Sequence, residues 1–259
     1  MKNNPDLIDS MLKISSASSF SEAWEGLSYG AEKLEIKIGS YAFGLIGNRA
    51  PEDPFKTEYE FSDEAVYYFN YNDEYNQAYV EKEFFDCDTT VNWACNNTTP
   101  ALWSMVDRPI TSGLLGGRHK ELYHTTRDFG MKTGAIIPLR KSNDPSIGGL
   151  VIYTDNDIAE SQADRLLQER MQDMKLLAEV FHLYRPINEL SKARFKLSSR
   201  EKECLEYLCL GYGIKQIASR LGTHDRTVQK QIASAKKRLN ARTMTQVVVR
   251  ALMFELINL

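Results

Sequence analysis

The sequence predicts an α+β protein, with an N-terminal α/β/α sandwich around an antiparallel sheet and a C-terminal all-α domain of four helices. The chain has 259 residues, which is longer than the usual single domain. Strand-like and amphipathic helical runs are mixed in the first 185 residues, without the alternation of a βαβ repeat. From residue 197 onward only helical periodicity occurs. The predicted boundaries are 1–185 for the first domain, 186–196 for a polar linker and 197–259 for the second domain.

The first domain is expected to begin with an amphipathic helix, because apolar residues recur every three or four positions from Phe20 to Leu34. Ser19 and Glu22 have the spacing of a capping box at its start. The elements expected next are a strand at Ser40–Gly47, a loop with two prolines at Arg49–Phe55, a strand at Val66–Tyr71 and a helix at Asp73–Glu83.

Two further strands are expected to complete the sheet. Gly134–Arg140 and Gly148–Asp155 are β runs, and the turn-forming residues 141–147 between them predict an antiparallel hairpin. The other parts of this half are a polar segment at Asn92–Asp107, an expected helix from His119 to near Gly130, and an expected long helix with an apolar stripe from Ala163 to Phe181 that ends before Pro186. That stripe is typical of core packing, and dimer contact is an open alternative.

The C-terminal domain has clear signals at its helix ends. Ser198 and Glu201 form a capping-box pair, and Gly211 lies where a helix-ending glycine belongs. The remaining helices are expected at Ile214–Leu221, Thr227–Asn240 and Thr243–Ile257, with a short turn at Thr223–Asp225 between the second and third.

Charge is segregated along the chain, although the formal net charge is only −3. From Ser191 to Leu259 there are 14 Lys and Arg against 5 Asp and Glu, and the preceding residues hold 18 against 30. Such segregation is typical of a protein in which one segment meets a polyanion. The alternative is chance clustering on solvated faces.

Several protein classes are not expected from this sequence. No run of 18 apolar residues occurs that would span a membrane, and the N-terminus lacks the apolar region of a secretory signal. We therefore expect a cytoplasmic protein without a membrane partner. No metal or cofactor is expected, because the cysteines show no metal-ligand spacing and are interpreted as reduced thiols: Cys87, Cys95, Cys204 and Cys209.

The third C-terminal helix has an apolar inner side and a polar, basic outer side. Its outward residues are Arg226, Gln229, Lys230, Ser234, Lys236 and Lys237. Two helices joined by a tight turn, the second rich in Lys, Arg and Gln, are typical of a helix-turn-helix. DNA offers phosphates to such cations and base edges to such side chains. A solvated basic helix without a partner is the alternative.

This segment resembles the LuxR-type helix-turn-helix domain over its whole length. The matching residues are Leu197, Ser198, Arg200, Glu201, Leu205, Gly211, Ile217, Ala218, Leu221, Gly222, Arg226, Thr227, Val228, Ile232, Lys237, Leu239 and Asn240. The resemblance places Gln229, Lys230 and Ala233 near bases, and Arg226, Thr227, Lys236 and Lys237 near phosphates. One departure is His224, where the family usually has a capping Ser, so Thr223 or Asp225 is expected to cap instead. In the last helix, Val247 and Ala251 are the implied dimer contacts.

The N-terminal half resembles the acyl-homoserine-lactone-binding domain of quorum-sensing LuxR regulators. Four positions match the family pattern: Tyr79, Asp88, Trp103 and Gly134, the last within Phe129-Gly130-x-x-x-Gly134. Two positions depart from it, because Tyr75 stands for a Trp and Thr89 for a Pro.

The resemblance implies a role for each of these residues. Asp88 would accept the ligand amide N–H, Tyr79 would donate to the amide carbonyl, and the Tyr75 hydroxyl would donate to the ring carbonyl. Trp103 would be an apolar wall against the head group. The residues that could surround a tail are Tyr41, Phe43, Tyr67, Phe69 and Ile136.

Each of these residues also has a structural interpretation. Tyr75 and Tyr79 lie one helical turn apart and fit plain core packing, as does Trp103. Asp88 fits a cap of the following turn, through Thr89 and Thr90.

The two resemblances together imply a dimeric, ligand-responsive transcriptional regulator of the quorum-sensing type. Its partners would be promoter DNA, an acyl-homoserine lactone or related amphiphile, a second copy, and RNA polymerase. The alternative is a regulator whose N-terminal domain serves dimerisation or a non-lactone signal and which binds DNA without ligand. An enzyme is not expected, because the only nucleophile–base candidate, Cys87 with His119 or His124, has no motif around it.

Overall fold

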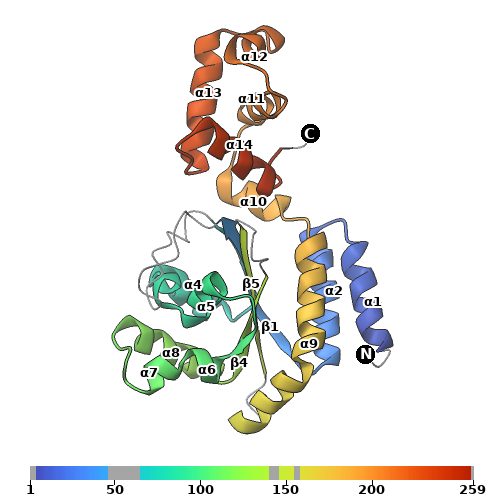
Figure 1. The fold of residues 1–259 in the computed structure, drawn as a ribbon, viewed down its shortest axis with the longest axis vertical. Coiled ribbons are helices and arrows are strands. Elements are labelled where there is room, and N and C mark those ends of the chain that lie inside the picture. The colour runs from blue at the N-terminus through green and yellow to red at the C-terminus, as the bar shows by residue number, and fades with distance from the viewer. Residues whose placement is uncertain (1–3, 46–64, 140–145, 155–157, 258–259) are drawn as a thin grey trace. The chain divides into compact units, whose positions relative to one another are not determined.

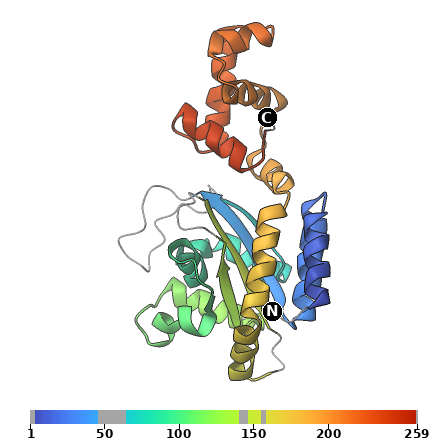
Figure 2. The ribbon, with the colours of Figure 1, turned by 45° about the vertical axis from the view of Figure 1, so that its right-hand side comes forward.

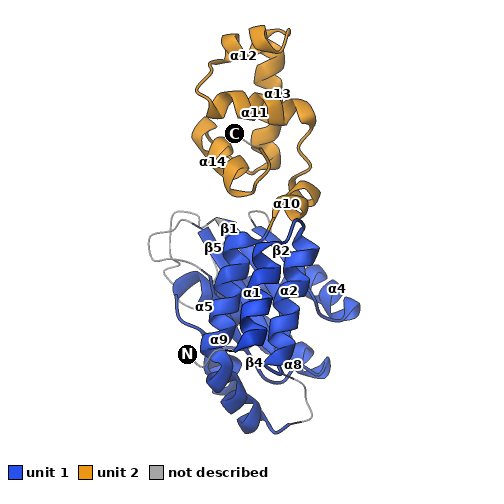
Figure 3. Ribbon diagram, turned by 90° about the vertical axis from the view of Figure 1, so that its right-hand side faces the viewer, with its two compact units in different colours: residues 1–185 blue, residues 186–259 orange. Residues whose placement is uncertain are grey.

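The computed structural model describes residues 4–45, 65–139, 146–154 and 158–257. The chain divides into two compact units, Met1–Arg185 and Pro186–Leu259 (Figure 3). The predicted loop Arg49–Phe55 and most of the predicted turn 141–147 lie outside the described residues.

The first unit contains a sheet of the five strands β1 (Lys37–Leu45), β2 (Ala65–Phe69), β3 (Ala101–Leu102), β4 (Gly134–Pro138) and β5 (Ser146–Tyr153). The strand order is β2-β1-β5-β4-β3, and all neighbours are antiparallel. The antiparallel sheet and the pairing of the last two long strands were both predicted correctly. Because side chains alternate between the two faces of a strand, each face of this sheet needs its own cover.

Three helices cover one face: α1 (Pro5–Ser15), α2 (Phe20–Lys33) and α9 (Glu160–Tyr184) (Figures 1 and 2). The sequence interpretation missed α1. Its signals are the Asn4 cap, which accepts from the Asp6 amide, and a proline in the first turn. Helix α1 packs closely on α2, and the Ser10 hydroxyl donates to the Gly26 carbonyl of α2 at 2.7 Å.

The opposite face is covered by shorter helices, so the unit is the predicted α/β/α sandwich (Figure 1). The polar segment 92–107, to which the sequence interpretation assigned no element, carries helical residues and the short strand β3, and Asp88 caps the first of its helices. The helices of this second layer are α4 (Asp73–Glu81), η1 (Phe84–Cys87), α5 (Thr89–Asn96), α6 (Trp103–Val106), α7 (Arg108–Thr111) and α8 (Arg118–Asp128).

The second unit contains the four predicted helices, α11 (Ser199–Cys209), α12 (Ile214–Arg220), α13 (Asp225–Arg238) and α14 (Met244–Met253). The predicted capping box of Ser198 and Glu201 is present. The stretch 186–196, expected as a linker, contains a further helix, α10 (Asn188–Phe195). This helix was not predicted because its sequence is mostly polar, and only Ser191 and Phe195 of its residues are buried. The Phe195 ring lies 4.7 Å from that of Phe254.

Candidate ligand cavity and nucleic-acid interface

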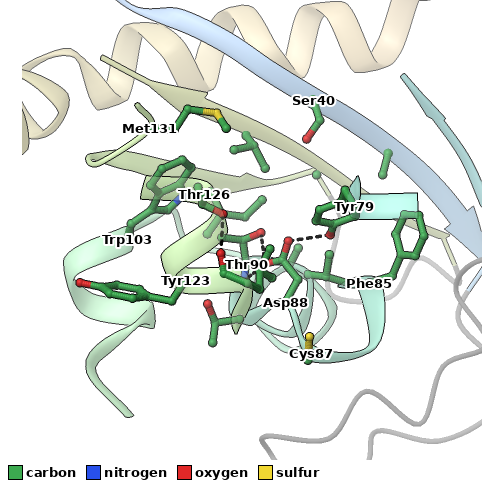
Figure 4. A pocket seen from close by; sticks show the side chains of 18 of the residues that line it. Ser40, Tyr79, Phe85, Cys87, Asp88, Thr90, Trp103, Tyr123, Thr126 and Met131 are labelled. Carbon is green, nitrogen blue, oxygen red and sulfur yellow. Dashed lines mark hydrogen bonds between the residues drawn. The ribbon is translucent and has the colours of Figure 1, made fainter. Parts of the chain in front are cut away.

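A cavity of about 90 Å³ lies in the first unit, between the sheet and the layer of short helices (Figure 4). Its walls come from strands β1, β2, β4 and β5 and from helices α4, α5, α6 and α8. Most of the lining is aromatic or aliphatic, and a few polar groups face the interior. This is the usual composition of a small-molecule site.

Asp88 has both of the roles that the sequence left open. It caps α5, because its Oδ1 accepts from the Thr90 amide at 2.7 Å and from the Thr90 hydroxyl at 2.6 Å. It also lines the cavity, where its Oδ2 accepts from the Tyr79 hydroxyl at 2.7 Å (Figure 4). A carboxylate oxygen has two lone pairs, so Oδ2 retains capacity for one more donor.

Tyr75 and Tyr79 are buried in the core and also line the cavity. The Tyr75 hydroxyl lies 3.1 Å from the Thr126 hydroxyl. Burial raises the pKa of both phenols, so both remain protonated donors. The sequence interpretation missed Tyr71, which lines the same cavity 3.3 Å from the Ser40 hydroxyl. Its signal was visible, since Tyr71, Tyr75 and Tyr79 form a ladder at intervals of four.

Trp103 begins α6 and is 7% exposed. Its indole packs against β4 at Gly134, where an added Cβ would lie 2.6 Å from Trp103 Cε2 and 2.5 Å from the Ile152 carbonyl oxygen. Gly134 therefore acts by its lack of a side chain and not by a contact with ligand. Trp103 Nε1 is buried and has no hydrogen-bond partner among the described residues.

A second carboxylate, Asp107, lines the same cavity and was not singled out from the sequence. The Thr89 hydroxyl donates to Asp107 Oδ1 at 2.6 Å. Burial raises the pKa of this carboxyl from 3.8 to about 6. A local signal existed, because Asp107 follows Trp103 by one helical turn.

The predicted tail contacts are divided between the two faces of the sheet. Tyr67, Phe69 and Ile136 line the cavity. Tyr41 borders it, but its ring packs on the other face, 5.1 Å from that of Phe181. Phe43 lies on the same face as Tyr41, with its ring 5.6 Å from that of His182. The assignment of the Tyr41 and Phe43 rings to a tail pocket is therefore corrected: β1 presents its aromatic side chains to the long helices.

Cys87 lines the cavity, but its thiol donates to the Phe84 carbonyl at 3.4 Å and burial raises its pKa to about 12. A thiol with this pKa stays protonated and is a poor nucleophile. Within the described ranges, no group of three potential metal ligands occurs, and no helix is long and apolar enough to cross a membrane.

In the second unit, α12, a short turn and α13 form the predicted helix-turn-helix (Figure 3). Val228, Ile232 and Ala235 of α13 are buried. The predicted base and phosphate contacts lie on the other side of the helix: Arg226, Thr227, Gln229, Lys230, Ala233 and Lys237 are exposed, and Lys236 is half-buried. The expectation that Thr223 or Asp225 caps α13 is wrong, because His224 is the N-cap residue and the position has no side-chain capping bond.

The predicted dimer contacts on α14 also need correction. Val247 and Ala251 are 0% exposed, because they pack into the core of their own unit. The large apolar side chains that α14 does expose are those of Met244, Val249 and Leu252.

A small-molecule cavity in one unit and a basic helix-turn-helix in the other define a ligand-responsive, DNA-binding regulator. The chain belongs to the LuxR family of bacterial regulatory proteins. The family description "Autoinducer binding domain" matches residues 54–184, and "Bacterial regulatory proteins, luxR family" matches residues 196–251. This finding confirms the resemblance in both halves of the chain.

Similar proteins include transcriptional activators of the same family. LuxR of Aliivibrio fischeri is 23% identical over 71% of this chain and 72% of that protein. RaiR of Rhizobium etli is 28% identical over 68% and 71%. The structure of SdiA in complex with octanoyl-rac-glycerol matches with a TM-score of 0.53 at 20% identity, over 97% of this chain and 96% of that one. CepR2 from Burkholderia cenocepacia, titled N-acylhomoserine lactone dependent, matches at 0.52 and 15%, over 70% and 92%. These two structures share the fold.

Proposed function

We propose that the first unit binds an acylated small amphiphile, an acyl-homoserine lactone or a related compound, and thereby controls DNA binding by the second unit. The observation that carries this proposal is the Asp88 carboxylate, aligned by Tyr79 at the wall of a largely apolar cavity. An acceptor in such a place suits a ligand amide N–H or hydroxyl, which otherwise loses a hydrogen bond worth about 1–3 kcal/mol on burial. The octanoyl-rac-glycerol complex of SdiA supports the amphiphile class.

Ligand binding would stabilise the first unit by mass action. The proposal includes a homodimer, whose two α13 helices would reach successive major grooves, and contact with RNA polymerase. The proposal also places the protein in the cytoplasm, where the chromosomal operator lies. It assigns the protein no catalytic step. On α14, the proposed contact with a second copy is made by the exposed residues Val249 and Leu252. The residues assigned from the sequence, Val247 and Ala251, are buried.

A second candidate is a regulator that binds DNA at full affinity without ligand. One observation favours it: the hydroxyls of Tyr75 and Tyr79 and both oxygens of Asp88 have partners within the protein itself. Measuring operator affinity of ligand-free protein separates the two candidates. Unchanged affinity on ligand addition would favour this second one.

The proposed cavity is tested by titrating the full chain with N-octanoyl-homoserine lactone in a calorimeter. Asp88→Asn keeps the shape of the side chain but removes its charge, and should weaken binding about tenfold. The matched control is Asp128→Asn on α8, which is exposed and does not line the cavity. Equal affinities for the wild-type protein and Asp88→Asn would contradict the assignment.

A further inference from the structure

The polar groups of the cavity fall into two sets. Asp88, Tyr79 and Thr90 form a set in which every group already has a partner within the set, and Asp88 Oδ2 can accept one more donor. Trp103 and Asp107 form a second set with unused capacity. The Trp103 indole N–H is buried without a partner, and Asp107 Oδ2 makes no hydrogen bond among the described residues. Leaving a buried donor without a partner is unfavourable, so this second set is suited to a polar group of a ligand.

The second set is built close to the first. Thr89 directly follows Asp88, and its hydroxyl holds Asp107 Oδ1 at 2.6 Å. The Asp107 amide donates to the Trp103 carbonyl at 2.8 Å, so the carboxylate is one helical turn from the indole. The Asp88 and Asp107 carboxylates therefore line the same cavity, and Thr89 links them because it follows Asp88 in the chain and donates to Asp107.

A purely structural role for Asp107 has a specific counter-observation. Asp107 occupies the N-cap position of α7, yet its side chain makes no capping hydrogen bond there. Arg127, the cation that also lines the cavity and attracts this carboxylate, forms its salt bridge with Glu160 at 2.6 Å and not with Asp107. The Asp107 carboxylate is turned to Thr89 and the cavity instead. The proline usual after the family's aspartate has no hydroxyl, so it could not hold Asp107 in this way.

We propose that Asp107 and Trp103 form a second head-group subsite. It selects an amphiphile whose head group carries its own O–H or N–H donor, in addition to the linking amide or ester. Asp107 accepts this donor, and the Trp103 indole N–H donates to a neighbouring carbonyl or hydroxyl oxygen. This inference rests on the proposed function and narrows its ligand class, because a homoserine lactone ring offers acceptors only and leaves Asp107 without a donor.

Two probes with one tail and one amide test the subsite: N-octanoyl-homoserine lactone, and N-octanoyl-homoserinol, whose opened head group carries two hydroxyls. The full chain should bind the homoserinol probe about tenfold more tightly. Asp107→Asn should abolish most of this preference. Thr89→Val, which frees Asp107 from its positioning partner, should reduce the preference less. The control Asp128→Asn, on the exposed face of α8, should keep it.

The outcomes separate this inference from the proposed function. If both probes bind and Asp88→Asn weakens both, but the wild-type protein shows no preference for the homoserinol, only the subsite is overturned. The same holds if Asp107→Asn keeps the preference. If neither probe binds the wild-type protein, the proposed function and the subsite are both overturned.

Discussion

The two units of this protein present their function in opposite ways. In the second unit, the groups proposed to contact DNA lie on the exposed side of one helix, α13, over a small apolar core. In the first unit, the groups proposed to contact a ligand lie inside, and they come from segments more than 60 residues apart in the chain, such as Ser40 and Trp103. The surface can change without affecting the fold, whereas the cavity and the core share residues such as Tyr75 and Tyr79.

The largest expected effect tests this sharing of core and cavity. Gly134→Ala would place a methyl group 2.5 Å from the Ile152 carbonyl and 2.6 Å from the Trp103 ring. The first unit should lose about 3 kcal/mol of stability or more, because backbone and indole must both shift. Thermal unfolding followed by calorimetry measures this loss. Gly116→Ala, where the added group meets nothing within 4 Å, is the control. Equal stability of the two variants would show that Trp103 does not pack on β4 as described.

The next effect concerns the stability of the first unit as a function of pH. The folded pKa of Asp107, about 6, exceeds its usual 3.8, so the folded protein takes up this proton before the unfolded chain does. Stability from this group is therefore present below about pH 4 and is lost as the pH rises to about 6. Asp107→Asn should stabilise the ligand-free protein by roughly 2 kcal/mol near pH 7.5 and hardly at all near pH 4. Urea unfolding at the two pH values measures the difference. A variant that is destabilised near pH 7.5 would contradict a carboxyl group whose charged form is disfavoured by burial.

A smaller effect is expected at the exposed surface of α13. Lys230→Ala should weaken operator binding about fivefold and make the salt dependence shallower by roughly one ion, while the stability of the unit stays the same. Lys120→Ala, an exposed change in the first unit, is the control. Anisotropy titrations at several salt concentrations provide both values. An unchanged salt slope would remove Lys230 from the interface.

The smallest effect uses the missing cap of α13. His224→Ser should supply a side-chain acceptor at this helix start and stabilise the second unit by about 0.5–1 kcal/mol. Chemical unfolding monitored at helix wavelengths measures the change. A loss of stability would show that His224 has a packing role that the capping argument omits.

The same contrast explains how far the sequence could be interpreted. Helical periodicity and capping residues act within one or two turns, so α11 to α14 and their exposed faces were predictable from local pattern. The four longer strands of the sheet were predictable for the same reason, whereas the two-residue strand β3 was not. Local pattern does not determine which face of β1 meets which layer, and Tyr41 was therefore placed on the wrong side. Nor does it show that an apolar stripe is already covered, which is why Val247 was assigned to a dimer contact.

Asp107 and Tyr71 show the remaining limit. Both residues have a local signal in the sequence, but their hydrogen-bond partners, Thr89 and Ser40 respectively, lie far away in the chain and cannot be found from local pattern. The residues that departed from the family pattern, Tyr75 and Thr89, turned out to have specific partners, Thr126 and Asp107. Both departures from the family pattern therefore lie at residues that line the cavity.

A crystal structure of the full chain grown with N-octanoyl-homoserinol tests the central claim most directly, namely that the cavity holds the signal. The account predicts density in the cavity of the first unit, with the ligand amide nitrogen at hydrogen-bond distance from Asp88 and a hydroxyl at hydrogen-bond distance from Asp107. A cavity without ligand density, in crystals of protein that binds the compound in solution, would contradict it.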